Sequence, residues 1–164
     1  MFTILFISNI EISAQLNTTT VGDAVDQGDN CFLITNDLSN QRGGVWYDNP
    51  IDFSNDFAIN YQNNFGDNDS SGADGMALVF KTTPDVVIDE TIKEIGYDSM
   101  DNSLILEFDT LLNSHLRDPF YDHLSIIKNG NPNQNNTGTK LTRPTIPWPQ
   151  GQNIETTKPT VAVH

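Results

Sequence analysis

Five side chains that bind hard or borderline metal ions lie close together in the sequence, and they are Glu107, Asp109, Asn113, Asp118 and His123. They occur on and between the apolar stretches "LEFD" and "HLSIIK", which are typical of buried strands. A solvated run of charges would be scattered over polar sequence instead. We therefore expect these side chains to form one metal-binding site.

The spacing of the two carboxylates that begin this group predicts that they share one face of a strand. Residues two apart point the same way on a strand, so Glu107 and Asp109 lie on one face. Leu104, Leu106 and Phe108 lie on the other, where we expect them to pack into the core. Two adjacent carboxylates repel each other unless a cation or a proton lies between them.

His123 begins the next apolar stretch, and antiparallel pairing could bring it back beside Glu107, while the intervening loop supplies Asn113 and Asp118. Asp109, Asp118, Asn113 and a loop carbonyl offer only oxygen, which suits Ca²⁺. Glu107, Asp109, Asp118 and His123 add an imidazole, which suits Mn²⁺ or another transition ion. We expect two ions bridged by Asp109 and Asp118.

Each of these residues has an ordinary explanation when it is taken alone. Asp118-Pro119 is a common start of a turn, and a single histidine is usually just a surface or core residue. The combination of all five at this spacing favours the metal site.

In the rest of the chain, short apolar runs alternate with turn-forming residues, as is typical of an all-β protein. Short apolar runs separated by Asn, Asp, Gly and Pro predict strands at 31–35, 44–47, 57–65, 76–81, 104–109 and 123–128. In the run 57–65, Phe57, Ile59, Tyr61 and Phe65 alternate with polar residues, as on a half-buried strand. The stretch "DVVIDETIKEI" is expected to be a loop with at most one helical turn, and "TVAVH" to begin a further strand. The fold class predicted is an antiparallel β-sandwich.

Composition and charge restrict the classes of function. The chain has 164 residues, 37% of them hydrophobic, which suffices for one domain with a core or for part of one. Eight basic and 22 acidic residues give a net charge of -14, which argues against nucleic-acid binding and against adhesion to anionic membranes. No apolar stretch is long enough for a transmembrane helix. The single cysteine, Cys31, excludes an intramolecular disulfide and is expected to be a small buried apolar residue.

The first residues, "MFTILFISNIEISAQ", contain an apolar stretch that ends at small residues. This pattern is similar to the second half of a secretory signal peptide, so we expect residues 1–15 to be a partial signal peptide and the protein to be secreted or displayed on the cell surface. The alternative is that these residues form a first β-strand.

The metal-ligand pattern resembles the metal loop of the legume-type (L-type) lectins. The pattern is Glu-x-Asp-x-x-x-Asn-x4-Asp-x4-His within "LEFDT…DP…H", and it is the specific part of the likeness. The stretch "GADGMALVF" is similar to the Ala-Asp-Gly strand of that family, and "GGVWYDNPIDF" is similar to a stretch of its bacterial members. The resemblance implies a concanavalin A-like jelly-roll β-sandwich over residues 16–164.

The resemblance also implies roles for individual residues. Glu107, Asp109, Asp118 and His123 would hold the transition ion, and Asp109, Asn113, Asp118 and the carbonyl of Leu111 would hold Ca²⁺. Asp74 would follow a cis peptide bond and accept hydrogen bonds from two sugar hydroxyls. Asn113 would bind Ca²⁺ through its oxygen and donate its NH₂ group to the sugar. The metals would then preorganise a sugar site and take no part in catalysis.

The sequence departs from the family pattern in the sugar site. Relatives usually place an aromatic ring, which stacks on the sugar, at the position of Leu111. Lys93 and Glu94 stand where the family commonly has glycines, one of which gives a backbone N–H to the sugar, so Glu94 is the expected donor here. The sandwich would also need further strands after residue 164, so we expect a domain that is incomplete at its C-terminus.

Three functions follow from these observations. The first is non-catalytic carbohydrate binding, with a glycan as partner and with oligomers or tandem modules supplying avidity. The second is a structural or adhesive module that keeps the metals but does not bind sugar. The third is a glycoside hydrolase of the same fold class, which needs two carboxyls about 5–5.5 Å apart. Leu112 occupies the position of the second glutamate, so no enzymatic activity is expected.

Overall fold

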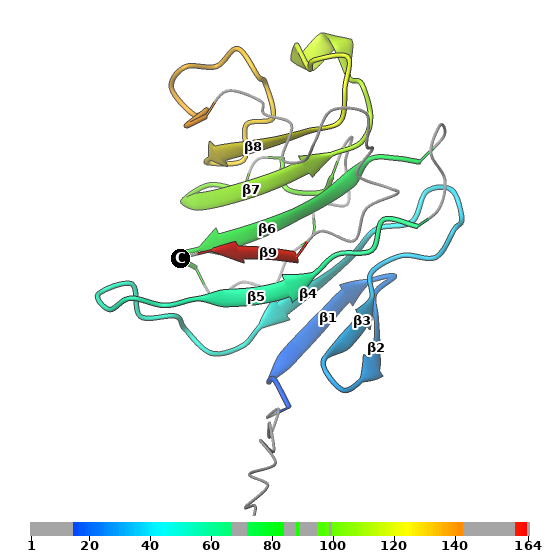
Figure 1. Ribbon diagram of the computed structural model, residues 1–164, viewed down its shortest axis with the longest axis vertical. Helices are drawn as coiled ribbons and strands as arrows, with labels where there is room; N and C mark the ends of the chain where they lie inside the picture. Colours follow the sequence, from blue (N-terminus) through cyan, green and yellow to red (C-terminus); the bar gives the residue numbers. More distant parts are fainter. Residues whose placement is uncertain are drawn as a thin grey trace, which may run out of the picture. The chain divides into compact units, whose positions relative to one another are not determined.

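The structure is a computed structural model that describes residues 15–66, 72–83, 88, 95–98, 100–142 and 160–163. The chain divides into two compact units, Met1–Pro50 and Ile51–His164. The first contains β1 (Thr18–Gly22), β2 (Val25–Gly28), β3 (Cys31–Leu33) and β4 (Gly43–Tyr47) (Figure 1). The second contains β5 (Ile59–Gln62), β6 (Gly75–Lys81), β7 (Ser103–Asp109), the 3₁₀ turn η1 (Ser114–Leu116), β8 (His123–Lys128) and β9 (Thr160–Val163).

In the first unit two antiparallel pairs form, β1 with β4 and β2 with β3. Asp29 and Asn30 join β2 to β3 and both have positive φ angles, 51° and 58°, as a two-residue hairpin turn requires. All four residues of β2 are exposed. The prediction that Cys31 is buried is wrong, because its side chain is exposed on this two-stranded hairpin, where it approaches the side-chain oxygen of Gln27.

The second unit contains a three-stranded antiparallel sheet in the order β6-β7-β8, with the three strands side by side (Figure 1). β7 is the central strand, and its apolar residues Ile105 and Phe108 are fully buried, as is Ile127 on β8. These three side chains form much of the described core. Apolar runs on a central strand favour this arrangement because both faces of the strand can be covered.

The burial of side chains on the two faces of β7 differs from the prediction made from the sequence. Phe108 is buried as expected, but Leu104 is 38% exposed, while Ile105 is fully buried together with Glu107 and Asp109. The carboxylate face is covered at Glu107 by Gln134, from the loop after β8, and by Tyr97, both of which donate hydrogen bonds to Glu107. The prediction that Leu104 packs into the core is therefore wrong, and the acidic face of the strand is a buried one.

Every apolar run predicted to be a strand contains one, although β3 and β5 are shorter than their runs. Ile59 and Tyr61 on β5 are partly buried and alternate with exposed neighbours, as predicted. The C-terminal stretch also forms a strand, β9, which pairs with β5. β1 and β2 were not predicted, because their sequences are polar. Most of the stretch "DVVIDETIKEI" lies outside the described residues.

Helices contribute almost nothing to the part of the chain that the structure describes. η1 is a single 3₁₀ turn, so within that part no helix is long and apolar enough to cross a membrane. Every strand pair is antiparallel. The all-β class predicted from the sequence is confirmed.

Candidate metal centre

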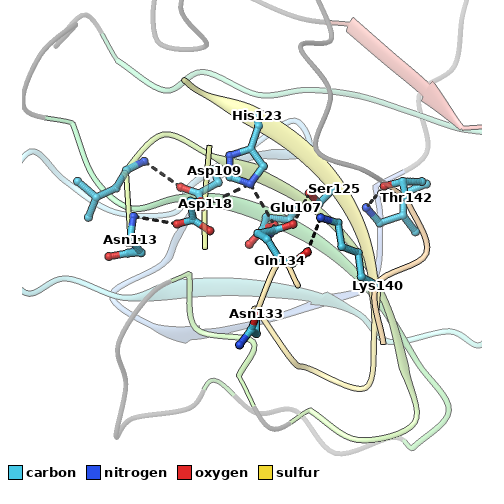
Figure 2. Close-up of polar contacts among 12 residues, drawn as sticks. Glu107, Asp109, Asn113, Asp118, His123, Ser125, Asn133, Gln134, Lys140 and Thr142 are labelled. Atoms are coloured by element: carbon cyan, nitrogen blue, oxygen red, sulfur yellow. Dashed lines mark hydrogen bonds and ion pairs between the residues drawn. The ribbon is translucent and has the colours of Figure 1, made fainter. Parts of the chain in front are cut away.

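The pairing of β7 with β8 brings three of the predicted metal ligands together. Asp109 lies directly opposite His123 in the register, and Glu107 lies opposite Ser125. Directly opposite residues of an antiparallel pair project from the same face of the sheet. Glu107, Asp109 and His123 therefore converge on one side of β7 and β8 (Figure 2).

The distances within this cluster are those of ligands that share an ion. The His123 Nε2 atom lies 3.9 Å from Glu107 Oε2 and 3.8 Å from Asp109 Oδ2. One ligand atom from each of the three residues lies within 4.8 Å of the others. Two atoms bound at about 2.0–2.2 Å to one ion are typically about 3–4 Å apart. The cluster could therefore hold a metal ion.

All three side chains are buried, with exposed fractions of 2% for Glu107, 5% for Asp109 and 1% for His123. Burial lowers the pKa of His123 to about 4, so its imidazole is neutral at pH 7 and the two carboxylate approaches are not ion pairs. A backbone hydrogen bond at Tyr121 opposes this shift. Because Nε2 has no hydrogen-bond partner, that bond uses Nδ1, which leaves Nε2 as the ligand atom.

The Asp109 carboxyl lies in an environment that disfavours its negative charge. The pKa of its carboxyl is raised to about 8, chiefly by burial and also by the negative charges of Glu107, Asp118 and Asp74, while a hydrogen bond from the backbone of Leu111 opposes the shift. A carboxyl in this position resists ionisation at neutral pH. A bound cation would remove the penalty by neutralising the cluster.

Two buried polar atoms within the described part of the chain support a fit to metal. Asp118 Oδ1 and His123 Nε2 are both buried and make no hydrogen bond. A buried polar atom without a partner is costly, so such atoms are rare unless an ion or water completes them. One oxygen and one nitrogen facing this cluster match the mixed donor set that transition ions accept.

The loop that follows β7 positions the remaining predicted ligands. The backbone N–H of Leu111 donates to Asp109 Oδ1 at 2.8 Å, and the backbone N–H of Asn113 donates to Asp118 Oδ2 at 2.8 Å. Burial raises the pKa of the Asp118 carboxyl, and the hydrogen bond from the backbone of Asn113 opposes that shift. These contacts fold the loop around the two aspartates (Figure 2). The assignment of Leu111 and Asn113 as Ca²⁺ ligands remains a prediction.

Asp74 lies at the start of β6, next to the metal cluster. The peptide bond between Ala73 and Asp74 is cis, as the sequence resemblance implied. The Asp74 carbonyl accepts a hydrogen bond of 3.1 Å from the Thr110 N–H, and Gly75 pairs with Asp109. Burial raises the pKa of the half-buried Asp74 carboxyl.

Gly75 permits this close approach of β6 to β7. Its φ is +136°, a conformation that residues with a side chain rarely adopt. A Cβ atom placed there would lie 2.1 Å from the carbonyl oxygen of Phe108. The glycine after Asp74 is therefore required by the geometry of the two strands.

Sequence reasoning missed a set of polar residues that surround Glu107. Tyr97 donates its hydroxyl to Glu107 Oε1, and Gln134 Nε2 donates to Glu107 Oε2 at 2.9 Å. Ser125 Oγ donates to Gln134 Oε1 at 3.0 Å. Gln134 lies in the polar loop "NGNPNQNNTGT", where no local pattern distinguishes it from its neighbours. Lys93 and Glu94, predicted at the sugar site, lie outside the described residues.

The chain matches the model of the legume lectin beta-barrel domain over residues 7–160. It belongs to the L-type lectin family. The concanavalin A-like β-sandwich predicted from the sequence is the fold of this family, and the antiparallel strands described above agree with it. L-type lectin domains are typically non-catalytic and have glycans as ligands. The family thus suggests carbohydrate binding for this chain.

Proposed function

We propose that this L-type lectin domain binds carbohydrate without catalysis, at a site that bound metal ions hold in place. The observation that carries the proposal is the position of Asp74 beside the buried Glu107, Asp109 and His123 cluster. Asp74 reaches Asp109 through the β6–β7 register and the hydrogen bond from Thr110. An ion that orders Asp109 would therefore also order the backbone that presents Asp74.

A transition ion, Mn²⁺ or a similar one, is proposed for the cluster of Glu107, Asp109, Asp118 and His123. A neutral buried imidazole together with carboxylates suits such an ion better than an all-oxygen site does. The burial of His123 and the unpartnered Nε2 atom support this assignment. The ion would neutralise carboxylates that otherwise repel each other.

Ca²⁺ is proposed for the adjacent loop, with Asp109, Asp118, Asn113 and the carbonyl of Leu111 as ligands. These are the oxygen donors that Ca²⁺ prefers. The unpartnered Asp118 Oδ1 supports the presence of a second cation. Asn113 would then bind Ca²⁺ through its side-chain oxygen and donate its NH₂ group to a sugar hydroxyl.

The proposed sugar contacts are Asp74, Asn113, Leu111 and the backbone of Glu94. Leu111 is 37% exposed and so can contact a sugar ring, but it offers no aromatic face for stacking. A single site of this kind is expected to be weak, with a Kd of about 1 mM, which corresponds to a binding free energy of about -4 kcal/mol. Homo-oligomers or tandem modules would raise the avidity, and a secreted or surface location would give access to glycans.

The test is glycan-array binding by the wild type and by two variants, Asp74→Ala and Asp74→Asn, with Ca²⁺ and Mn²⁺ or with EDTA. We expect wild-type binding that EDTA abolishes and that both variants lose while keeping a metal-dependent melting temperature. The exposed Asp101→Asn variant is the matched control and should bind as the wild type does. Binding that survives both EDTA and Asp74→Ala would refute the proposal.

A structural or adhesive module that retains the metals is the second candidate. It is favoured by Leu111, an exposed aliphatic residue where relatives usually have a ring. This candidate predicts no glycan binding under any condition and a melting temperature that still falls on chelation. Glycoside hydrolysis would require a second catalytic carboxyl, and Leu112 stands at that position.

A further inference from the structure

Gln134 occupies an unusual position in the described part of the chain, because it is a loop residue that is only 4% exposed. It lies between β8 and the segment 139–142, which pairs back along β8. Lys128 N–H donates to Thr139 at 2.8 Å, and Leu141 N–H donates to Ile126 at 2.8 Å. The loop between these points is thereby closed over the face of the sheet that carries the metal cluster.

The polar groups of Gln134 are engaged by four separate parts of the fold. Its Nε2 donates to Glu107 Oε2 on β7 at 2.9 Å, and its Oε1 accepts from Ser125 Oγ on β8 at 3.0 Å. Its backbone N–H donates to the carbonyl of Leu116 in η1 at 2.9 Å, and its carbonyl accepts from Lys140 Nζ at 2.6 Å. Figure 2 shows the carboxamide directed at Glu107.

The chemistry of these partners fixes the orientation of the carboxamide. Glu107 as a carboxylate can only accept hydrogen bonds, so it must face the NH₂ group of Gln134. The hydroxyl of Ser125 then donates to the remaining oxygen. A reversed carboxamide would place an oxygen against the carboxylate and would be repelled. The bond to Glu107 is thus a charge-assisted one, which is stronger than a neutral hydrogen bond.

We propose that Gln134 is a positioning residue for the metal centre, which holds Glu107 in its ligating orientation and links it to the loop that carries Asn113 and Asp118. The link to that loop is the bond between the Gln134 N–H and Leu116, which lies between these two residues. Gln134 does not itself bind the ion. This inference rests on the proposed function, since it assumes that Glu107 is a metal ligand.

The expected size of the effect follows from other metal sites. Groups that hydrogen-bond a metal ligand commonly change metal affinity by about 10–100-fold when they are removed. Gln134→Met preserves the length of the side chain but removes both polar groups. We expect this variant to bind Mn²⁺ about 10–100-fold more weakly than the wild type. Asn135→Ala, an exposed neighbour in the same loop, is the matched control and should bind normally.

The measurement is the Mn²⁺ dissociation constant of each full-length variant, determined by electron paramagnetic resonance of free Mn²⁺ at a temperature where circular dichroism shows the metal-free protein folded. Co²⁺ bound in place of Mn²⁺ gives a second readout, because its visible absorption bands report ligand geometry. We expect these bands to change in Gln134→Met. A purely structural role would lower the melting temperature without changing either the affinity of the folded protein or the Co²⁺ bands.

Ser125→Ala tests the chain of contacts independently. Alone it should weaken Mn²⁺ binding less than Gln134→Met does. Added to Gln134→Met it should reduce the Mn²⁺ affinity by less than about 2-fold more, because the link to Glu107 is already broken. Mn²⁺ affinity of Gln134→Met within about threefold of the wild type, or fully additive losses, would overturn the role of Gln134. Absence of Mn²⁺ binding by the wild type would instead overturn the proposed metal site itself.

Discussion

Raising the pH from about 6.5 to 8 is expected to destabilise the metal-free protein, because Asp109 then loses a proton that its buried position favours. The carboxyl is only 5% exposed, and its pKa is raised to about 8 by burial and by neighbouring negative charges. A bound cation should abolish this loss of stability. The pH dependence of stability therefore reports the charge of a carboxylate that would bind the metal.

The magnitude follows from two groups that act in opposite directions. Asp109 has a pKa raised from 3.8 to about 8, so between these values the folded protein binds more protons than the unfolded chain and stability falls with pH. His123 has a pKa lowered from 6.5 to about 4, so between those values stability rises with pH. The two slopes oppose each other up to about pH 6.5. Above it His123 no longer opposes Asp109, and 1.5 pH units at 1.36 kcal/mol each give a loss of about 2 kcal/mol from Asp109. The raised pKa values of the Asp74 and Asp118 carboxyls act in the same direction.

The assay is urea denaturation of the EDTA-treated protein at pH 6.5, 7.2 and 8, repeated with saturating Mn²⁺. We expect the free energy of unfolding to fall by about 2 kcal/mol without metal and to stay constant with it. Asp109→Asn keeps an oxygen that can accept from Leu111 but carries no charge, so its metal-free stability should be constant over this range. The exposed Asp101→Asn variant should keep the wild-type slope. A wild-type protein with constant stability, or a slope that persists in Asp109→Asn, would refute the reasoning.

Three further changes have expected outcomes. Phe108→Ala leaves a cavity at a fully buried position on the central strand. It should lower the free energy of unfolding by about 3–5 kcal/mol in urea denaturation. A loss below about 1 kcal/mol would contradict the core assigned to β7. Gly75→Ala forces a side chain against the Phe108 carbonyl at positive φ and should cost more than about 2 kcal/mol by the same assay, and a neutral result would contradict the strand geometry. Leu111→Tyr adds an aromatic face that should strengthen sugar binding by about 0.5–1.5 kcal/mol. Calorimetric titration with a glycan chosen from the array should therefore show about 2–10-fold tighter binding than in the wild type. Unchanged affinity would place the sugar away from Leu111.

The sheet around the site was predictable from local pattern. The runs that became β6, β7 and β8 are apolar, bounded by turn residues and long enough for strands. β1 and β2 lack that signal, because "TTTVG" and "VDQG" hold a single valine each. Pairing with a neighbour forms these strands, and nothing in their own sequence indicates that partner.

The cluster of Glu107, Asp109 and His123, which could hold a metal ion, was predictable because such side chains are rare on apolar strands and their spacing is regular. Asp109 and His123 needed only the antiparallel register of two consecutive strands to meet. Gln134 was not predictable in this way. It reaches Glu107 across 27 positions of the sequence through the return of a polar loop, and its residue type is common in such loops. The burial of Glu107 and its face of β7 was missed for the same reason, since that loop supplies the cover.

The most direct test of the central claim is the number of metal ions that one chain binds. The protein should be loaded with Mn²⁺ and Ca²⁺, freed of excess metal by gel filtration and analysed by inductively coupled plasma mass spectrometry, alongside His123→Gln. The account predicts about one Mn²⁺ and one Ca²⁺ per chain, with Mn²⁺ lost in the variant because the imidazole ligand is gone. Metal at background level in the wild type would contradict it, because the buried Glu107, Asp109 and His123 cluster would then bind no ion.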